Sequence, residues 1–373
     1  MKATLHNVQM LRFLAAGMVL VSHLQHEVPS VHGLDSHGYS PWTPIWFAGG
    51  VDIFFVISGF IMYIIAADSF GKPNASQDFI VRRLLRVVPP YWLFTTAMLV
   101  AAILFKEHVS HAVLSVPHVI ASYLFLPWEN PYGQFYPVLI LGWTLNFEML
   151  FYLIFAVALR FSLRTGLIVI AATISCIALS GLILNLNSTP FAFWLNPIVM
   201  EFLFGIALAY VFRRGVRWQR VTGLPVIAAA LGVMVWMQDS GIAGNYWAAR
   251  CLWMGLPALA ICAGAILIEK QAAPNRIQRA LILGGDASFV LYLSHPFSLA
   301  IVAAVWPLLG INSPIAYVIS AGIVAFASAV VLHLWLEKPV MSYLNSQFRS
   351  PRPTVIHTTI ARDQLNLPHA VKS

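Results

Sequence analysis

Ten mostly apolar runs, most of them about as long as a membrane span, follow one another along this chain. A soluble fold of 373 residues could not bury so much apolar side chain, since 59% of the residues are hydrophobic and only 10% are charged. The pattern therefore predicts an all-α, polytopic integral membrane protein. The predicted transmembrane helices are Val8–Val28, Gly49–Ala67, Pro90–Phe105, Val138–Leu159, Gly166–Leu184, Phe191–Phe212, Leu224–Met237, Tyr246–Ile268, Phe289–Leu309 and Pro314–Leu336.

The distribution of basic residues supports this count. Lys and Arg concentrate in cytoplasmic loops, and a cytoplasmic N-terminus places 20 of the 22 basic residues on that side, all except Lys106 and Arg250. We therefore expect ten helices with both termini in the cytoplasm, as a membrane domain over residues 1–340 and a polar, mobile tail over 341–373. The same rule accounts for the net charge of +8, so no nucleic-acid partner is predicted.

Ionisable side chains inside predicted helices are the first functional candidates, because each costs at least about 2.5–3.5 kcal/mol at the helix centre. Arg12 and His23 are eleven positions apart in the first helix. That spacing equals three turns plus about 20°, so both side chains project from one face, separated by about 16 Å along the axis. The alternative is an arginine that reaches the inner headgroups and a histidine that is hydrogen-bonded to a neighbouring helix.

A cluster of arginines precedes the third predicted helix. Arg82, Arg83 and Arg86 lie at helical spacing, ahead of a break predicted at Pro89–Pro90. Guanidinium groups bind phosphate in a bidentate manner, so the cluster could hold a phosphorylated cofactor at the inner face. The alternative is an anchor on anionic lipid, required only by the orientation of the protein.

Three further residues need partners in the membrane. Glu148 requires either a cation or a proton. Asp52 opens the second predicted helix, where a carboxylate can simply cap the helix. His295 precedes Pro296, so backbone carbonyls freed by the proline could satisfy it. No set of His or Cys residues has the spacing of metal ligands, and no metal is predicted.

Together these segments resemble the acyltransferase-3 family of membrane acyltransferases. The resemblance covers roughly residues 5–340. The segments that carry it are Arg12-x10-His23, Gly-Val-Asp-Ile-Phe-Phe-Val-Ile-Ser-Gly-Phe (50–60), Arg83-x-x-Arg86 with Pro89, Trp143-Thr-Leu-Asn-Phe-Glu148, and Ser288-Phe-Val-Leu-Tyr-Leu-Ser-His295-Pro. Thr144 stands where the family pattern has serine, and the hydroxyl is retained.

The resemblance implies an O-acetyltransferase of the cell inner membrane. Such an enzyme moves an acyl group, commonly acetyl from acetyl-CoA, to a hydroxyl of a sugar or other cell-envelope molecule. The family members closest in size act on exopolysaccharide and lipopolysaccharide precursors. We expect Arg82, Arg83 and Arg86 to hold the CoA phosphates. His23 is then the general base or the acyl carrier, Arg12 steers the cofactor or stabilises developing negative charge, and Glu148 orients the imidazole or neutralises an arginine. Aromatic residues in the loops 26–47 and 106–137 suit stacking on the rings of a sugar acceptor, and an aromatic belt at the membrane interface explains them equally well.

Two other classes of protein remain open at this point. A transporter or flippase for a lipid-linked sugar or an acyl carrier is also compatible with ten spans and buried charges. A sensor or channel is a third interpretation. The sequence leaves open the acceptor, the acyl chain length, the side of the membrane on which the acceptor is modified, and the oligomeric state.

Overall fold

The computed structural model describes residues 2–32, 34, 39–40, 45–104, 115–130, 132–184, 190–239, 249–268 and 273–348. Parts of both predicted acceptor loops, the start of the eighth predicted span and residues 349–373 of the predicted tail lie outside these ranges. The longer elements are α1 (Lys2–Glu27), α2 (Gly49–Ala66), α3 (Ala75–Leu104), α4 (Val116–Tyr123), α5 (Trp143–Ala158), α6 (Leu163–Ile183), α8 (Met200–Arg213), α9 (Arg220–Asp239), α11 (Leu256–Ile266), α12 (Arg276–Asp286), α13 (Ser288–Val305), α14 (Pro314–Leu332) and α15 (Lys338–Phe348). The shorter elements are α7 (Pro190–Trp194), η1 (Val28–Ser30), η2 (Ile45–Ala48), η3 (Ala67–Ser69), η4 (Ile140–Gly142), η5 (Pro197–Val199), η7 (Cys251–Gly255), η8 (Trp306–Leu309) and η9 (His333–Glu337).

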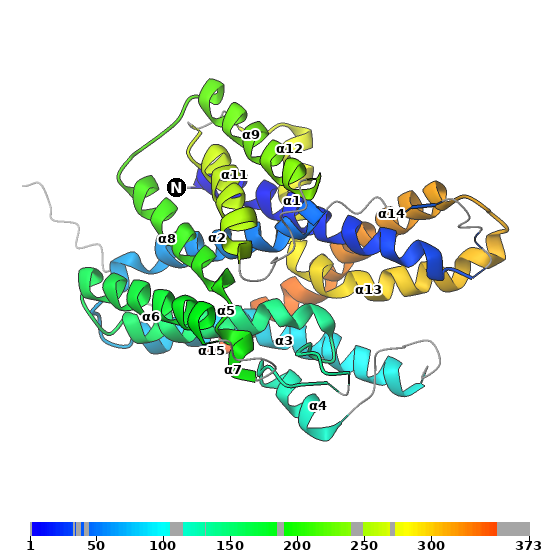
Figure 1. The fold of residues 1–373 in the computed structure, drawn as a ribbon, viewed down its shortest axis with the longest axis horizontal. Coiled ribbons are helices and arrows are strands. Elements are labelled where there is room, and N and C mark those ends of the chain that lie inside the picture. The colour runs from blue at the N-terminus through cyan, green and yellow to red at the C-terminus, as the bar shows by residue number, and fades with distance from the viewer. Residues whose placement is uncertain are drawn as a thin grey trace, which may run out of the picture.

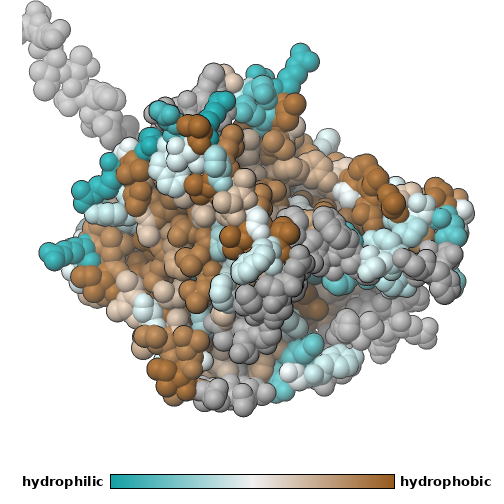
Figure 2. Space-filling model, turned by 45° about the horizontal axis from the view of Figure 1, so that its top comes forward, coloured by the Kyte–Doolittle hydropathy of each residue, from teal (hydrophilic) through white to brown (hydrophobic). Residues whose placement is uncertain are grey.

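The protein is an all-α, multi-pass membrane protein. Nine helical segments in the described ranges are long and apolar enough to cross a membrane, and a tenth apolar segment, Cys251–Ile266, is shorter. These ten segments correspond to the ten predicted spans. Apolar side chains cover much of the visible surface, with hydrophilic groups gathered mainly toward its edges (Figure 2). Large apolar side chains such as Ile183 are 74% exposed, as expected for surfaces that face lipid rather than water.

Helix α3 corrects one prediction, because the Pro89–Pro90 pair does not break it. The helix runs continuously from Ala75 to Leu104 with both prolines inside, so the arginines and the third span belong to one helix. Each proline removes one backbone N–H donor. Packing on both sides of the pair compensates, since the buried side chains of Phe79, Val87 and Tyr91 follow helical spacing across it.

The last span also extends beyond its predicted end. Helix α14 passes through a π-helical turn, His333–Glu337, into α15, which ends at Phe348. Residues 341–348, which the sequence assigned to the polar tail, are therefore helical, and α15 packs against α3.

Helix α1 lies at the centre of the bundle. It packs against α2, α11, α12, α13 and α14, and it runs beside α13 in Figure 1. Helix α2 packs along α8 with its backbone close to that of its neighbour. A Cβ atom at Gly59 would lie 2.1 Å from the carbonyl oxygen of Phe202, and one at Gly205 would lie 2.0 Å from that of Val56. The two glycines thus permit the close approach of the helices, which is typical of helix pairs in membranes.

Candidate functional site

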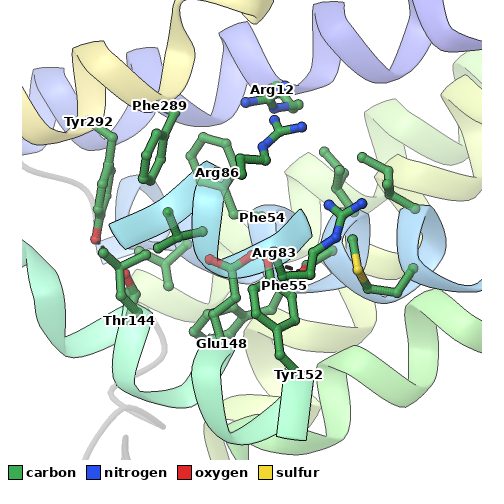
Figure 3. A pocket seen from close by; sticks show the side chains of 17 residues that line it. Arg12, Phe54, Phe55, Arg83, Arg86, Thr144, Glu148, Tyr152, Phe289 and Tyr292 are labelled. Atoms are coloured by element: carbon green, nitrogen blue, oxygen red, sulfur yellow. Dashed lines mark hydrogen bonds between the residues drawn. The ribbon is translucent and has the colours of Figure 1, made fainter. Parts of the chain in front are cut away.

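A pocket opens between helices α1, α2, α3, α5 and α13 (Figure 3). It contains about 790 Å³ of empty space, including the part that opens to solvent. The lining side chains are Arg12, Val51, Phe54, Phe55, Ile57, Ser58, Ile61, Met62, Arg83, Arg86, Val87, Thr144, Leu145, Glu148, Tyr152, Phe289 and Tyr292. The pocket therefore brings together charged residues that are far apart in the sequence.

Three guanidinium groups reach this pocket. Arg83 and Arg86 lie one turn apart on α3, and Arg12 enters from α1 above them in Figure 3. Arg12 is only 8% exposed and donates to the side-chain oxygen of Gln9 at 2.9 Å, whereas the guanidinium of Arg83 lies over the Phe79 ring at 5.8 Å. Among the described residues, no carboxylate oxygen lies within 4.0 Å of any of the three.

Glu148 is held by hydroxyl groups instead. Its Oε1 atom accepts from the Ser58 hydroxyl at 3.1 Å and from the Tyr152 hydroxyl at 2.5 Å. Tyr152 lies one turn along α5, so helical spacing aims both side chains into the same pocket. The lining thus contains three arginines and one glutamate, a formal surplus of two positive charges. Arg12 is buried and Arg83 is partly buried, whereas Arg86 is exposed at the mouth of the pocket. Cations removed from water need compensation, so this surplus suits a multiply charged anion such as a phosphate ester.

Two further polar residues at the pocket were not identified as site residues from the sequence. The hydroxyls of Thr144 and Tyr292 are 3.0 Å apart, and each donates to the carbonyl oxygen of Leu141 at 3.1 Å. These contacts tie α5 to α13 across 148 residues of sequence. A hydroxyl at position 144 was expected from the family pattern, but its partner on α13 was not.

Not every predicted site residue lines this pocket. Arg82 points elsewhere: it is 54% exposed, and its guanidinium lies 3.9 Å from the carboxylate of Asp78. His23 is not among the lining residues either. Its ring lies against that of His295 on α13, with ring centroids 5.1 Å apart. His295 in turn follows Tyr292 by one turn, with ring centroids 6.4 Å apart. The histidines therefore lie beyond the Tyr292 end of the pocket.

Asp52 lies in the first turn of α2 but is not its N-cap, which is Ala48, and it pairs with Arg250 instead. Arg250, 198 residues away, donates from Nε to Oδ1 at 3.0 Å and from Nη2 to Oδ2 at 2.6 Å. Both residues are almost fully buried. Glu201 is also fully buried, and a Cβ atom at Gly255 would lie 2.9 Å from its Oε1. Arg250 thus connects the start of α2 to η7, outside the pocket. Among the described residues, no group of three His, Cys, Asp or Glu side chains could hold a metal ion.

Replacing Asp52 with alanine is expected to lower the free energy of unfolding by about 3–5 kcal/mol, because Arg250 would stay buried without its carboxylate. The matched control is Asp68→Ala, which removes the exposed Asp68–Arg213 pair and should cost at most about 1 kcal/mol. Unfolding of the detergent-solubilised variants measures both changes. Equal losses in the two variants would contradict a structural role for the buried pair.

Comparison with known proteins adds a family assignment to this geometry. A family model described as "Acyltransferase domain" matches residues 5–334. The chain is similar to the exopolysaccharide production protein ExoZ of Rhizobium meliloti (strain 1021), with 31% identity over 298 residues that cover 79% of this chain and 89% of the relative. It is also similar to nodulation protein 10 of Rhizobium leguminosarum bv. viciae, with 26% identity over 323 residues that cover 78% of this chain and 82% of the relative. No solved structure matches the chain.

Proposed function

The chain belongs to the acyltransferase-3 family of membrane acyltransferases, and from this premise we propose that it is an O-acyltransferase. It moves an acyl group, in the simplest case acetyl, from acyl-CoA to a sugar hydroxyl of an exopolysaccharide or lipopolysaccharide precursor. The similarity to ExoZ, a protein named for exopolysaccharide production, favours this acceptor class. The observation that carries the proposal is the meeting of Arg12, Arg83 and Arg86 in one pocket, with no carboxylate of the described residues within 4.0 Å of them.

The arginines are the binding site for the phosphates of CoA. A guanidinium can donate two parallel hydrogen bonds to a phosphate, and it keeps its charge under all physiological conditions. Arg83 and Arg86 supply two such groups from α3, while Arg12 supplies the third from α1, above them in Figure 3. Arg82 is left out of this site because it does not line the pocket and its guanidinium lies 3.9 Å from the carboxylate of Asp78.

His23 is the group that handles the proton. It lies about 16 Å farther along α1 than Arg12, given the rise of a helix, and the pantetheine arm of CoA is a linker of suitable length for that separation. The neutral imidazole takes the proton of the acceptor hydroxyl while the oxygen attacks the thioester carbonyl. The carbon–sulfur bond breaks, and the departing thiolate receives the proton from the imidazolium. In the alternative route, the imidazole itself carries the acyl group between donor and acceptor.

The arginine end of the bundle is the cytoplasmic end in this proposal. The bias of 20 of the 22 basic residues toward alternate loops supports this orientation, as does the supply of acyl-CoA in the cytoplasm. The membrane is then the cell inner membrane. The acceptor approaches the histidine end of the bundle. In the sequence, the loop 26–47 begins just after His23.

One experiment separates this function from transport. The purified full-length protein is reconstituted into vesicles with radiolabelled acetyl-CoA and with base-treated exopolysaccharide from the cells that make it. We expect the label to appear as an alkali-labile ester on the polysaccharide, with stoichiometric release of CoA. Uptake of label into the vesicles with neither ester nor free CoA would contradict the proposal and favour a transporter or flippase.

A further inference from the structure

Two histidine rings from different helices meet beside the pocket. His23 on α1 and His295 on α13 have ring centroids 5.1 Å apart, with an angle of 56° between the ring planes. His295 is only 1% exposed, whereas His23 is less completely buried. In a membrane protein, a buried imidazole without a structural partner is a functional candidate. The bonding of each nitrogen of His295 shows which role is open to it.

One nitrogen of His295 is committed to the backbone. Its Nδ1 atom lies 3.0 Å from the carbonyl oxygen of Leu291, one turn earlier in α13. A carbonyl can only accept, so Nδ1 must carry the hydrogen. Pro296 lies next in the helix and has no backbone N–H of its own. A backbone carbonyl therefore satisfies this nitrogen, but not one freed by the proline, because the missing N–H of Pro296 frees the carbonyl of Tyr292 rather than that of Leu291.

The other nitrogen has no partner. With the hydrogen on Nδ1, the neutral ring presents a lone pair at Nε2, and this atom is fully buried without a hydrogen-bond partner in the described part of the protein. Leaving a buried acceptor unsatisfied is energetically unfavourable. The neighbouring imidazole of His23, whose ring centroid lies 5.1 Å from that of His295, has an N–H to donate.

We propose that His295 is the positioning residue for His23, an inference that rests on the proposed function. Nε2 of His295 accepts the ring N–H of His23, directly or through one water. Hydrogen bonds between catalytic groups are often long in structures without substrate and shorten in the complex. The bond fixes the tautomer of His23, so its second nitrogen is bare and faces the acceptor hydroxyl. After His23 takes the proton, the same bond holds the imidazolium until the thiolate of CoA receives that proton.

The test compares His295→Phe with His295→Gln in the reconstituted acetyl-transfer assay. Phenylalanine keeps a ring but has no acceptor, whereas the amide oxygen of glutamine comes close to the position of Nε2. We expect His295→Phe to lower kcat about 10- to 100-fold, the value of one hydrogen bond to a charged group, with KM for acetyl-CoA unchanged. His295→Gln should recover a large part of that loss. The control is Ser298→Ala, because Ser298 lies one turn after His295 on α13 and hydrogen-bonds to Ser328 on α14. This variant should keep the wild-type kcat.

A double variant distinguishes positioning from general support of the fold. In a His23→Ala background, His295→Phe should lower the residual rate no further, because residues that act as a unit are not additive. Three results would each overturn the inference. The first is a wild-type kcat in His295→Phe, and the second is a further loss of rate when His295→Phe is added to His23→Ala. The third is a stably folded His295→Gln that is as slow as His295→Phe. The proposed function survives all three results if the wild type still makes the ester. A wild type that makes no ester would overturn both.

Discussion

Replacing His23 with alanine is expected to lower the rate of acyl transfer by about 10²- to 10⁴-fold, the usual contribution of a general base. The side chain is half-buried on α1 and makes its ring contact with His295 rather than with the bulk of the core. Its removal should therefore leave insertion and folding intact. The measurement is the initial rate of ester formation from radiolabelled acetyl-CoA, with gel filtration of the solubilised variant as the check on folding.

The control for this variant is His26→Ala. His26 lies one turn farther along the same helix and is exposed, so it shares the helix and the chemistry of His23 but does not lie against His295. The control should retain the wild-type rate. A His23→Ala protein that transfers acetyl at the wild-type rate would contradict both proposed roles of the imidazole, as general base and as acyl carrier.

The second large effect is expected for donor binding. Each hydrogen bond between a guanidinium and a phosphate is worth about 1.5–3 kcal/mol. Arg83→Ala and Arg86→Ala should each raise KM for acetyl-CoA about 10- to 100-fold, and the double variant should raise it further. The kcat at saturating donor should change little, because the arginines hold the phosphates far from the reacting carbonyl. Initial rates over a range of acetyl-CoA concentrations measure both constants.

Arg82→Ala is the matched control for the arginines. It removes the same charge from the same helix, next to Arg83 in the chain, yet its side chain is 54% exposed and lies outside the pocket. It should leave KM unchanged. If all three variants keep the wild-type KM, the arginines are anchors that set the orientation of the protein, as the alternative interpretation of the sequence holds. If all three raise KM equally, the attraction is a diffuse electrostatic effect rather than a site.

The spans, and the candidate side chains within them, could be predicted from the sequence because both depend on local properties. Whether a segment can span the membrane depends on the length and hydrophobicity of that segment alone. Helical periodicity likewise places Thr144, Glu148 and Tyr152 on one face of α5. The same periodicity separates Arg82 from Arg83 by about 100° around α3, but only the folded neighbours decide which of the two faces the pocket. The prolines of α3 show the limit of local rules, since they break isolated helices, whereas here packing on both sides maintains the helix.

Sequence alone thus determined that this chain is a helical membrane protein and which of its residues are chemically unusual there. The free-energy cost of placing a charge or an unpaired backbone group in lipid applies to each segment separately. Spans and unusual residues can therefore be predicted from each segment on its own. Only the tertiary structure decided the partners: Arg250 for Asp52, Ser58 for Glu148 and His295 for His23. These pairs join residues 90 to 272 positions apart in the chain. Such contacts exist only after the helices have packed, because hydrogen bonds and ion pairs act over a few ångströms of space, whatever the separation along the chain.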